Sequence, residues 1–573
     1  MVTLPQLQSL RPETLRLLLA LAFTCLIGVV SPWQEVFHPD DEGFELMKSW
    51  LLERGFPLYS EIWSDQPPLH TLLLAAVFHV FGPSVAIARM VALGFAWLAF
   101  WALGELAACR QGTPAACLAM TALALAAGFT RIAASATIML PAYALALVSI
   151  VLLRPRSRRR EEAEHSSIAA VRLLTSAATG VIAGHWRLLL SGACFGLAMQ
   201  IKFTPVLLLP VVAWELLRRN ASDTAGERPA NVRVRFRGLA IWAGGAALAF
   251  GSVLALFPAM TTELLWSPHF SPETRTAFAS APGPRALHAM LLADWDLVLL
   301  TAGGLMLAGC RKRAKSIPNS AVGGAHPPAG VAGCALASSS GEHAHVVKTP
   351  YDFVPRGFSA RARKTAPEGG CAPHAASEFI PPLLLLVTAY GAHLWQRPFW
   401  GYYYLHLAVP LAWLAALTVC ELARWVAEQR SRRTLLAGFA LAVAVLIPWV
   451  VRLPERMERA RNDLRTYHSD ARSVLVEILR KHSGQWCFSS HPGIAFQAGV
   501  PVPPEAVVLS QKRLRLGLFA NRDFIHCLET RKPGIVAFGG ANSFGQPGAS
   551  YLREHYEPLG EVAGFILHRR RPL

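Results

Sequence analysis

The sequence predicts an α-helical polytopic membrane protein with about 11–12 membrane segments, followed by a small soluble α/β domain. Of its 573 residues, 53% are hydrophobic and only 16% are charged, whereas ordinary soluble domains carry about 25% charged residues. Apolar segments of about 20 residues, the length that crosses a bilayer as a helix, recur along residues 1–451. The Lys and Arg residues lie in short blocks between these segments, which is the positive-inside pattern. The net charge of +18 therefore does not indicate a nucleic-acid partner.

The basic blocks also give the predicted orientation of the segments. Arg11 and Arg16 flank the first segment and predict a cytoplasmic N-terminus. The apolar core of 67–84 is short for a full span. If this segment crossed the membrane, the basic block 154–160 would lie outside. We therefore expect 67–84 to be re-entrant or to lie on the membrane surface. The predicted full spans are 15–30, 87–107, 113–129, 138–153, the two halves of 188–217, 239–257, 287–308, 379–395, 402–422 and 435–451.

Two regions differ from the apolar segments. Residues 316–376 are rich in Gly, Ala, Ser, Pro and His without apolar periodicity, which predicts a disordered cytoplasmic insertion. Eleven full spans place residues 452–573 on the outer side, where QWCFSS, AVVLS, GIVAFGG and AGFILHRR predict strands and SYLREHY a helix. Cys487 and Cys527 would there face an oxidising compartment. Whether they form a disulfide is left open.

The first outer loop, 33–66 with its flanks, is the main candidate for a functional site. It carries Asp40, Asp41 and Glu42 together, and Asp65 and Gln66 directly before two prolines. An acidic cluster at the hydrocarbon boundary is costly unless it is used. The alternative is an ordinary solvated acidic loop.

Two further stretches carry polar or aromatic residues near the membrane. Lys202 lies between the two apolar halves of 188–217 and is either functional or a lysine that snorkels to the interface. The outer turn 397–404 offers Arg397 and several tyrosines, whose alternative role is an interfacial aromatic belt.

The order and spacing of several motifs resemble one family. DDEG (40–43), GFPLY (55–59), SDQPPLH (64–70) and FGPSVAIARM (81–90) are similar to the first outer loop of the GT-C membrane glycosyltransferases, in the group of dolichyl-phosphate-mannose-protein mannosyltransferase-like and Rgt-type enzymes (glycosyltransferase family 39-like). SGACFGLAMQIKFTPVLLLP and FWGYYYLHLAVPLAWL resemble later family segments. Two departures are the insertion 316–376 and the stretch SATIMLPAY, which lacks the acidic residue that family members often carry there.

The resemblance implies transfer of a sugar from a polyprenyl-phosphate donor to a lipid, polysaccharide or protein acceptor, with inversion, at the periplasmic face of a cell inner membrane. Asp41 would be the general base, with Asp40 as its substitute and Glu42 positioning the acceptor or the base. A transporter or flippase for a polyprenyl-linked glycan and an inactive scaffold of the same fold are the alternatives.

The remaining site residues follow from the same resemblance. Lys202, Arg89 and Arg397 would neutralise the donor phosphate. No metal-ligand spacing occurs, and the residues leave open whether a divalent cation takes part. The expected substrate-binding residues are Asp65, Gln66, Tyr59, Tyr403, Tyr404 and His406.

Overall fold

The computed structural model forms two units, residues 1–307 with 378–573, and residues 308–377. Of the second unit, only 308–316 and 375–377 are described, so the predicted disordered insertion lies almost wholly outside the described residues. The described residues are 11–31, 33–36, 41–154, 173–222, 232–261, 268–269, 271–279, 283–316, 375–396, 399–428, 432–465, 470–482, 484–539 and 545–572.

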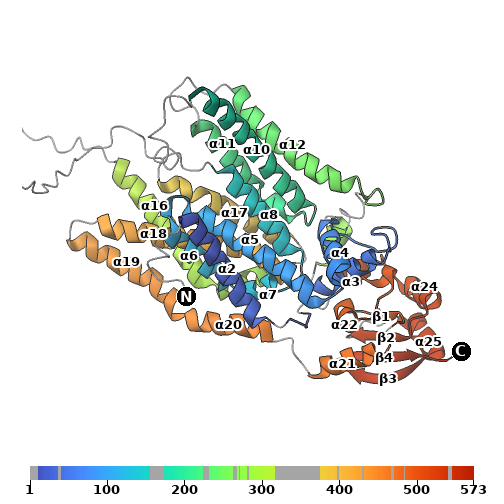
Figure 1. Cartoon of the computed structure of the whole chain (residues 1–573). Coiled ribbons are helices and arrows are strands. Elements are labelled where there is room, and N and C mark those ends of the chain that lie inside the picture. The colour runs from blue at the N-terminus through green and yellow to red at the C-terminus, as the bar shows by residue number, and fades with distance from the viewer. Residues whose placement is uncertain are drawn as a thin grey trace, which may run out of the picture. The chain divides into compact units, whose positions relative to one another are not determined.

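Helices make up most of the described residues before the C-terminal domain (Figure 1). In chain order they are α2 (Pro12–Val30), α3 (Asp41–Glu53), α4 (Leu69–Phe81), α5 (Val85–Gln111), α6 (Thr113–Ala124), α7 (Phe129–Ala133), α8 (Met139–Leu153), α10 (Leu173–Met199), η1 (Thr204–Leu208), α11 (Leu209–Ser222), α12 (Val232–Leu254), α14 (Pro272–Ala277), α15 (Pro284–Ala293), α16 (Trp295–Ser316), η3 (Ala375–Glu378), α17 (Ile380–Trp395), η4 (Gly401–Tyr404), α18 (Leu405–Glu428), α19 (Arg432–Val451), α20 (Leu453–Arg465) and α21 (Asp470–Arg480).

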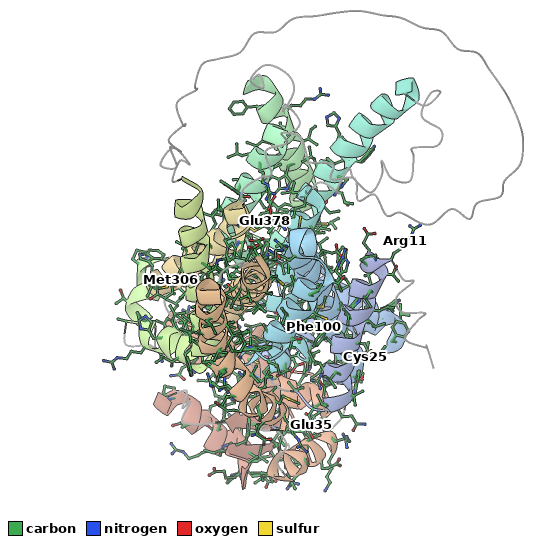
Figure 2. All side chains as sticks on the ribbon, turned by 90° about the vertical axis from the view of Figure 1, so that its left-hand side faces the viewer. Arg11, Cys25, Glu35, Phe100, Met306 and Glu378 are labelled. Carbon is green, nitrogen blue, oxygen red and sulfur yellow. The ribbon has the colours of Figure 1, made fainter. Side chains whose placement is uncertain are left out.

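The helical part has the surface of a multi-pass membrane protein. Large apolar side chains on its helices are exposed, among them Val29 (81%), Leu248 (70%) and Met306 (72%), while Phe100 is fully buried inside the bundle (Figure 2). A surface of this kind is stable against lipid and costly against water.

Candidate membrane spans can be identified by helix length and composition in the described part of the chain. In the described part of the chain, four single helices are long and apolar enough, and α15 with α16 forms a further, bent candidate. Four further apolar helices, α4, α6, α8 and α17, are shorter, with 10–17 residues. At about 1.5 Å per residue, such helices fall short of a core about 30 Å thick. The short helix α4 agrees with the expectation that 67–84 is not a full span.

The predicted break inside 188–217 is confirmed, and it lies beside the first loop. α10 ends at Met199, and η1 and α11 begin again after residues 200–203. The backbone carbonyl of Gln200 accepts a hydrogen bond from Leu69 N at 3.0 Å, so the break is fixed to the start of α4. α10 itself begins earlier than predicted and packs along α12 (Figure 1), where Gly192 and Gly196 let the two backbones approach closely.

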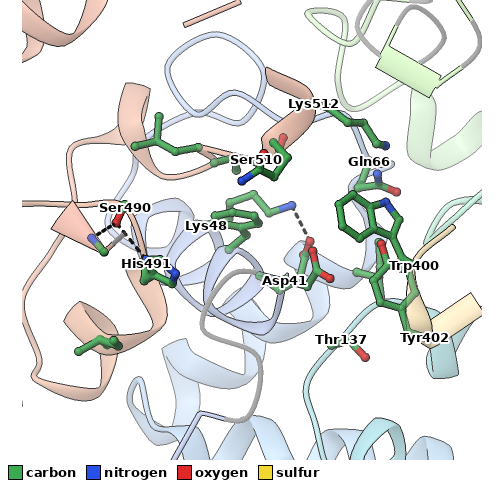
Figure 3. Close-up of a pocket in the computed structure, with 18 of the residues that line it drawn as sticks. Asp41, Lys48, Gln66, Thr137, Trp400, Tyr402, Ser490, His491, Ser510 and Lys512 are labelled. Carbon is green, nitrogen blue, oxygen red and sulfur yellow. Dashed lines mark hydrogen bonds and ion pairs between the residues drawn. The ribbon is translucent and has the colours of Figure 1, made fainter. Parts of the chain in front are cut away.

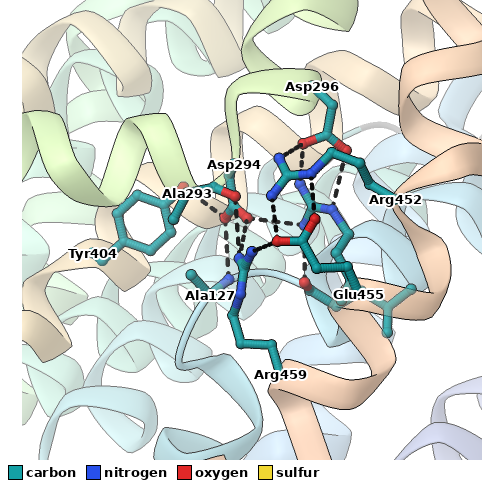
Figure 4. Close-up of polar contacts among 10 residues, drawn as sticks. Ala127, Ala293, Asp294, Asp296, Tyr404, Arg452, Glu455 and Arg459 are labelled. Atoms are coloured by element: carbon teal, nitrogen blue, oxygen red, sulfur yellow. Dashed lines mark hydrogen bonds and ion pairs between the residues drawn. The ribbon is translucent and has the colours of Figure 1, made fainter.

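The segment predicted as one span at 287–308 is instead bent by 81° between α15 and α16. Asp294 and Asp296 at the bend are fully buried and pair with arginines within α20 and directly before it (Figure 4). Arg456 Nη1 lies 2.9 Å from Asp294 Oδ1, and its Nε donates to Asp296 Oδ2 at 3.0 Å. Arg452 also contacts Asp296, at 3.1 Å. Buried acidic residues therefore also occur outside the first loop.

The C-terminal domain is a four-stranded sheet with short helices. Its elements are β1 (Cys487–Ser489), α22 (Pro492–Gln497), η5 (Pro504–Ala506), α23 (Gln511–Arg515), α24 (Asn521–Arg531), β2 (Ile535–Gly539), α25 (Gly545–His555), β3 (Tyr556–Val562) and β4 (Phe565–Arg570). The strand order is β1-β2-β4-β3, with β1 and β2 parallel and the other neighbours antiparallel.

Three of the four predicted strands are confirmed, and one is wrong. AVVLS is largely buried but joins no ladder, and its first residue ends the short helix η5 (Pro504–Ala506). The missed strand β3 contains a register shift between Pro558 and Gly560, residues that weaken a strand signal. Cys487 and Cys527 are both free and buried, so the disulfide left open by the sequence is not formed.

The first loop and the C-terminal domain share one hydrophobic core. Trp50 of α3 meets Phe496 of α22 edge-on at 5.6 Å, and Phe78 of α4 stacks on the same ring. The backbones of α3 and α22 approach so closely that a Cβ on Gly43 would lie 2.4 Å from Gly493 N. The loop is therefore held by the domain at the far end of the sequence.

Replacing Arg456 by Met tests whether the buried charge cluster holds the bend. Breaking a buried ion pair from one side typically costs about 3–5 kcal/mol, because the other charge stays buried. We expect Arg456→Met to unfold in detergent at a clearly lower temperature than the wild type. The control is Arg480→Met, which removes a half-exposed pair with Glu477 and should leave the unfolding temperature nearly unchanged. Equal unfolding temperatures for all of these proteins would contradict the prediction.

Candidate active site

A polar cavity of about 570 Å³ lies where the first loop, the break after α10, the turn before η4 and the C-terminal domain meet (Figure 3). The first loop contributes Asp41, Glu45, Lys48, Asp65 and Gln66 to its wall. Lys202, Trp400, Tyr402, Arg472, Ser490, His491 and Lys512 come from the other segments. A cavity of this size with converging polar groups is what a small-molecule site requires.

Asp41 is brought to the cavity by the start of α3. Asp41 and Glu42 stand in the first turn of this helix, where the helix dipole favours negative charge. Asp41 lines the cavity and is attracted electrostatically by Lys202 across it. Asp40, predicted as its substitute, lies outside the described residues.

Glu45 and Lys48 line the cavity from the same face of α3, and the sequence analysis did not single them out. Lys48 Nζ donates to Glu45 Oε1 at 2.8 Å, and Thr71 Oγ1 donates to Glu45 Oε2 at 3.2 Å. Both side chains are almost fully buried. Their spacing from Asp41, four and seven residues, is the period of one helix face, and that signal was available in the sequence.

Glu42 and Arg89 are together but face away from the cavity. Both are fully buried, and Arg89 Nη2 lies 3.4 Å from Glu42 Oε1. Ala136 N donates to the same Glu42 oxygen at 2.8 Å, and Arg89 also donates to Glu35 O at 2.8 Å. This pair fixes the start of α3 against α5 and the segment before α8. The structure thus places Arg89 beside Glu42 rather than on the cavity wall.

Asp65 lies in the wall with partners from distant parts of the chain. Lys512 Nζ lies 3.4 Å and His269 Nε2 lies 3.3 Å from Asp65 Oδ2, and Gln66 Nε2 donates to Oδ1 at 3.1 Å. Burial acts to raise the pKa of Asp65, but Lys512, His269 and the Gln66 hydrogen bond outweigh it and hold that pKa below its usual range. The pKa of His269 is lowered to about 4, mainly by burial and secondly by the positive charge of Lys512.

Tyr59 supports this arrangement from behind. It adopts a left-handed backbone conformation with φ of 73°, which is rare for a bulky residue. Its hydroxyl donates to Gln66 O at 2.7 Å. Tyr59 therefore fixes the backbone before the two prolines and does not itself line the cavity.

The tyrosines of the predicted aromatic turn have different surroundings. Lys202 Nζ lies 4.8 Å from the ring centre of Tyr402 and 5.4 Å from that of Tyr403, within cation–π range. Tyr404 donates to the buried Asp294 at 2.7 Å, and His406 stacks on His393, so neither lines the cavity. Arg397 lies outside the described residues.

A second, mainly apolar pocket of about 190 Å³ adjoins the first. Phe203, Val206, Ala392, Trp395 and Tyr403 are among the residues that line it. Lys202 and Gln66 line both pockets, so the cation stands at the junction of the polar and the apolar space. Among the described residues, no group of three or more His, Cys, Asp or Glu side chains is arranged to hold a metal ion.

Replacing Glu42 by Gln separates a supporting role from a chemical one. The substitution keeps an oxygen that can accept a hydrogen bond from Ala136 N, but it removes the negative charge that faces Arg89. Breaking a buried ion pair in this way lowers the free energy of unfolding by on the order of 3 kcal/mol. We expect Glu42→Gln to lower the unfolding temperature in detergent far more than Asp41→Asn, whose side chain is only partly buried. An Asp41→Asn variant less stable than Glu42→Gln would contradict these roles.

The comparisons with known proteins give the fold. No protein-family model and no curated protein sequence matches the chain. The crystal structure of ArnT from Cupriavidus metallidurans bound to undecaprenyl phosphate is similar with a TM-score of 0.53 and 10% identity, over 97% of this chain and 99% of that chain. The same protein in the apo state gives a TM-score of 0.50, 10% identity and the same coverage. The chain thus has the fold of the GT-C membrane glycosyltransferases.

Proposed function

We propose that this protein is a membrane glycosyltransferase that transfers a sugar from a polyprenyl-phosphate donor to a hydroxyl-bearing lipid, polysaccharide or protein acceptor. The observation that carries the proposal is the junction at Lys202, where a carboxylate-lined cavity opens beside an apolar pocket. A polyprenyl-phosphate sugar has the matching parts in the same order: an apolar chain, a phosphate and a polar sugar. The shared fold with a protein solved with undecaprenyl phosphate supports this assignment.

The donor is expected to bind across the junction. Its first isoprene units would occupy the apolar pocket between η1 and α17, against Val206 and Trp395. The phosphate would then lie at Lys202, which the rings of Tyr402 and Tyr403 hold in place. A cation at the bridging phosphate stabilises the charge that develops on the leaving group.

The sugar would lie in the polar cavity, where the chemistry takes place. An acceptor oxygen attacks the anomeric carbon and forms the new C–O bond. The bond from that carbon to the phosphate oxygen breaks, and its electron pair leaves with the polyprenyl phosphate. The acceptor proton passes to Asp41, the carboxylate that lines the cavity and faces Lys202. One displacement of this kind inverts the anomeric centre.

The other carboxylates of the wall suit substrate binding. Glu45 pairs with Lys48, and Asp65 lies beside Lys512 and His269, so both carboxylates are held in fixed positions. Ionised carboxylates accept strong hydrogen bonds from hydroxyl groups, and Trp400 and Tyr402 offer aromatic faces to a sugar ring. We place this reaction at the periplasmic face of a cell inner membrane, with a role in envelope glycans such as lipopolysaccharide.

The transporter alternative gains no support from the buried acids. Asp294 and Asp296 are ionisable residues inside the helical part, as a transporter would need. However, Arg452, Arg456 and Arg459 pair with them, and none of these residues lines either pocket.

Replacing Asp41 by Asn tests the proposed base. Membranes are given a pool of radiolabelled polyprenyl-phosphate sugars, and transfer into the remaining material is measured. Loss of a general base typically costs about 10²–10⁴-fold in rate, so we expect a loss of this size with Asp41→Asn at equal amounts of folded protein. The matched control is Glu61→Gln, a half-exposed acid of the same loop that does not line the cavity. A fully active Asp41→Asn variant would exclude Asp41 as the base.

Filling the apolar pocket tests where the donor tail binds. Ala392 lines the pocket, and Ala392→Phe adds a ring where the first isoprene units are expected. We expect the KM for the donor to rise at least about tenfold, which corresponds to a loss of about 1.4 kcal/mol of binding free energy. The kcat at saturating donor should change little. Leu394→Phe on the same helix faces outside the pocket and should behave as wild type. Unchanged donor KM in Ala392→Phe would refute this placement of the tail.

A further inference from the structure

The C-terminal domain reaches into the cavity with a lysine. Lys512 stands on the short helix α23 and lines the same cavity as Asp41 (Figure 3). Lys202 lines this cavity as well. Its Nζ donates to His269 Nδ1 at 2.8 Å and lies 3.4 Å from Asp65 Oδ2. Only about a tenth of each of these side chains is exposed, at 11% for Lys512, 13% for His269 and 10% for Asp65.

The position of Lys512 is set by its neighbours in the domain. Ser510 caps α23, its Oγ accepting a hydrogen bond from Arg513 N at 3.3 Å. The guanidinium of Arg513 donates to Glu505 O at 2.7 Å and lies 4.8 Å from the ring centre of Trp63. Because Trp63 belongs to the first loop, two residues before Asp65, this contact holds α23 against the segment that carries Asp65.

His269 connects the two charged groups. Lys512 donates to Nδ1, so the neutral imidazole carries its proton on Nε2, which then donates to the backbone carbonyl of Asp65 at 3.0 Å. The side chain of Lys512 therefore fixes the ring, and the ring fixes the backbone of Asp65. A lysine has a long, flexible side chain, and without a second contact such as the one to His269 it would not hold a carboxylate in one geometry.

We propose that Lys512 is a positioning residue for Asp65, through which the C-terminal domain completes the active site. This inference rests on the function proposed above, in which the Asp65 carboxylate binds substrate in the cavity. A buried carboxylate without a cation would take up a proton and lose its capacity to accept hydrogen bonds in both lone-pair directions. The domain thus supplies the lysine that contacts Asp65 directly, whereas Lys48 of the first loop is paired with Glu45.

Several charged and titratable groups surround Asp65 and can be separated by mutation. Lys202, Arg513 and Tyr59 interact with it electrostatically. Lys512 faces it from α23, His269 from the segment before α14, and Lys48 from α3, while Gln66 donates from the loop itself. Removing Lys512 leaves Asp65 buried but deletes the strongest electrostatic attraction on its carboxylate, so the pKa of Asp65 should rise. An opposite charge at this distance is typically worth about 1–3 pH units.

The experiment compares Lys512→Met, Lys512→Arg and Arg531→Met in the full-length protein. Arg531 joins the same domain to the same loop through Glu61 at 3.5 Å, but it does not line the cavity. Arg531→Met therefore removes one charge from the same interface without touching Asp65. All variants are first compared by thermal unfolding in detergent, so that a loss of folding is recognised.

Protonation of Asp65 is then followed without any assay of transfer. A hydrophobic carbodiimide reacts with protonated buried carboxyl groups, and the modified Asp65 peptide is quantified by mass spectrometry as pH falls. We expect labelling of Asp65 in Lys512→Met to begin about one pH unit or more above wild type, with Lys512→Arg and Arg531→Met close to wild type. Identical labelling curves for Lys512→Met and wild type would overturn the proposal.

The pH profile of sugar transfer gives the second measurement. A raised pKa of Asp65 means that the ionised form is lost at higher pH, so the acid-side loss of kcat/KM in Lys512→Met should move upward by a similar amount. Lys512→Arg should restore the wild-type profile at least in part. An equal shift in Arg531→Met would overturn the proposal in favour of docking alone. If the wild type transfers no sugar, the proposed function fails, and the labelling curves still decide the coupling of Lys512 to Asp65.

Discussion

Compensation of buried carboxylates is the constraint on which the rest of this structure depends. The acidic first loop is packed between the helical part and the C-terminal domain, and a carboxylate in such a place needs a cation or several donors. Glu42 has Arg89, Glu45 has Lys48, and Asp65 has Lys512 and His269. Asp41 lines the cavity as Glu45 and Asp65 do, and it is attracted electrostatically by Lys202. Its place on the cavity wall at the start of α3 is the reason why we propose Asp41 as the proton acceptor.

The same constraint explains two features of the helical part that would otherwise look like defects. α15 and α16 are bent at Asp294, and this acid accepts from Tyr404 and from Ala127 N as well as pairing with Arg456. The cluster therefore connects the bend with α20 and with the tyrosine turn that reaches the cavity. The break after α10 has a similar effect, because it brings Lys202 to the loop and leaves Gln200 O to accept from the start of α4.

The C-terminal domain is part of the site in both packing and charge. Its core is continuous with that of α3, and Gly43 and Gly493 allow backbone contact between them. Arg513 and Lys512, adjacent in sequence, bind Trp63 and Asp65 of the loop respectively. Removal of the domain would expose the apolar face of α3 and would leave Asp65 short of its cation. A loop that is assembled in this way acquires its geometry only when both ends of the chain have folded.

Much of this arrangement follows from the sequence alone, and the rest does not, for a definite reason. The length of the apolar segments and the basic blocks predicted a polytopic membrane protein. Local motifs predicted the acidic loop, the break at Lys202 and three of the observed strands. These signals are local, since they depend on hydrophobic period, helix length and turn residues within a few neighbours. Only the tertiary structure decided which charge pairs with which. Asp65 and Lys512 are 447 residues apart, and Arg456 and Asp296 are 160 apart, so packing alone brings them together. For the same reason Arg89, a candidate phosphate ligand by its motif, became the partner of Glu42, while Lys512, in no motif, reached the cavity.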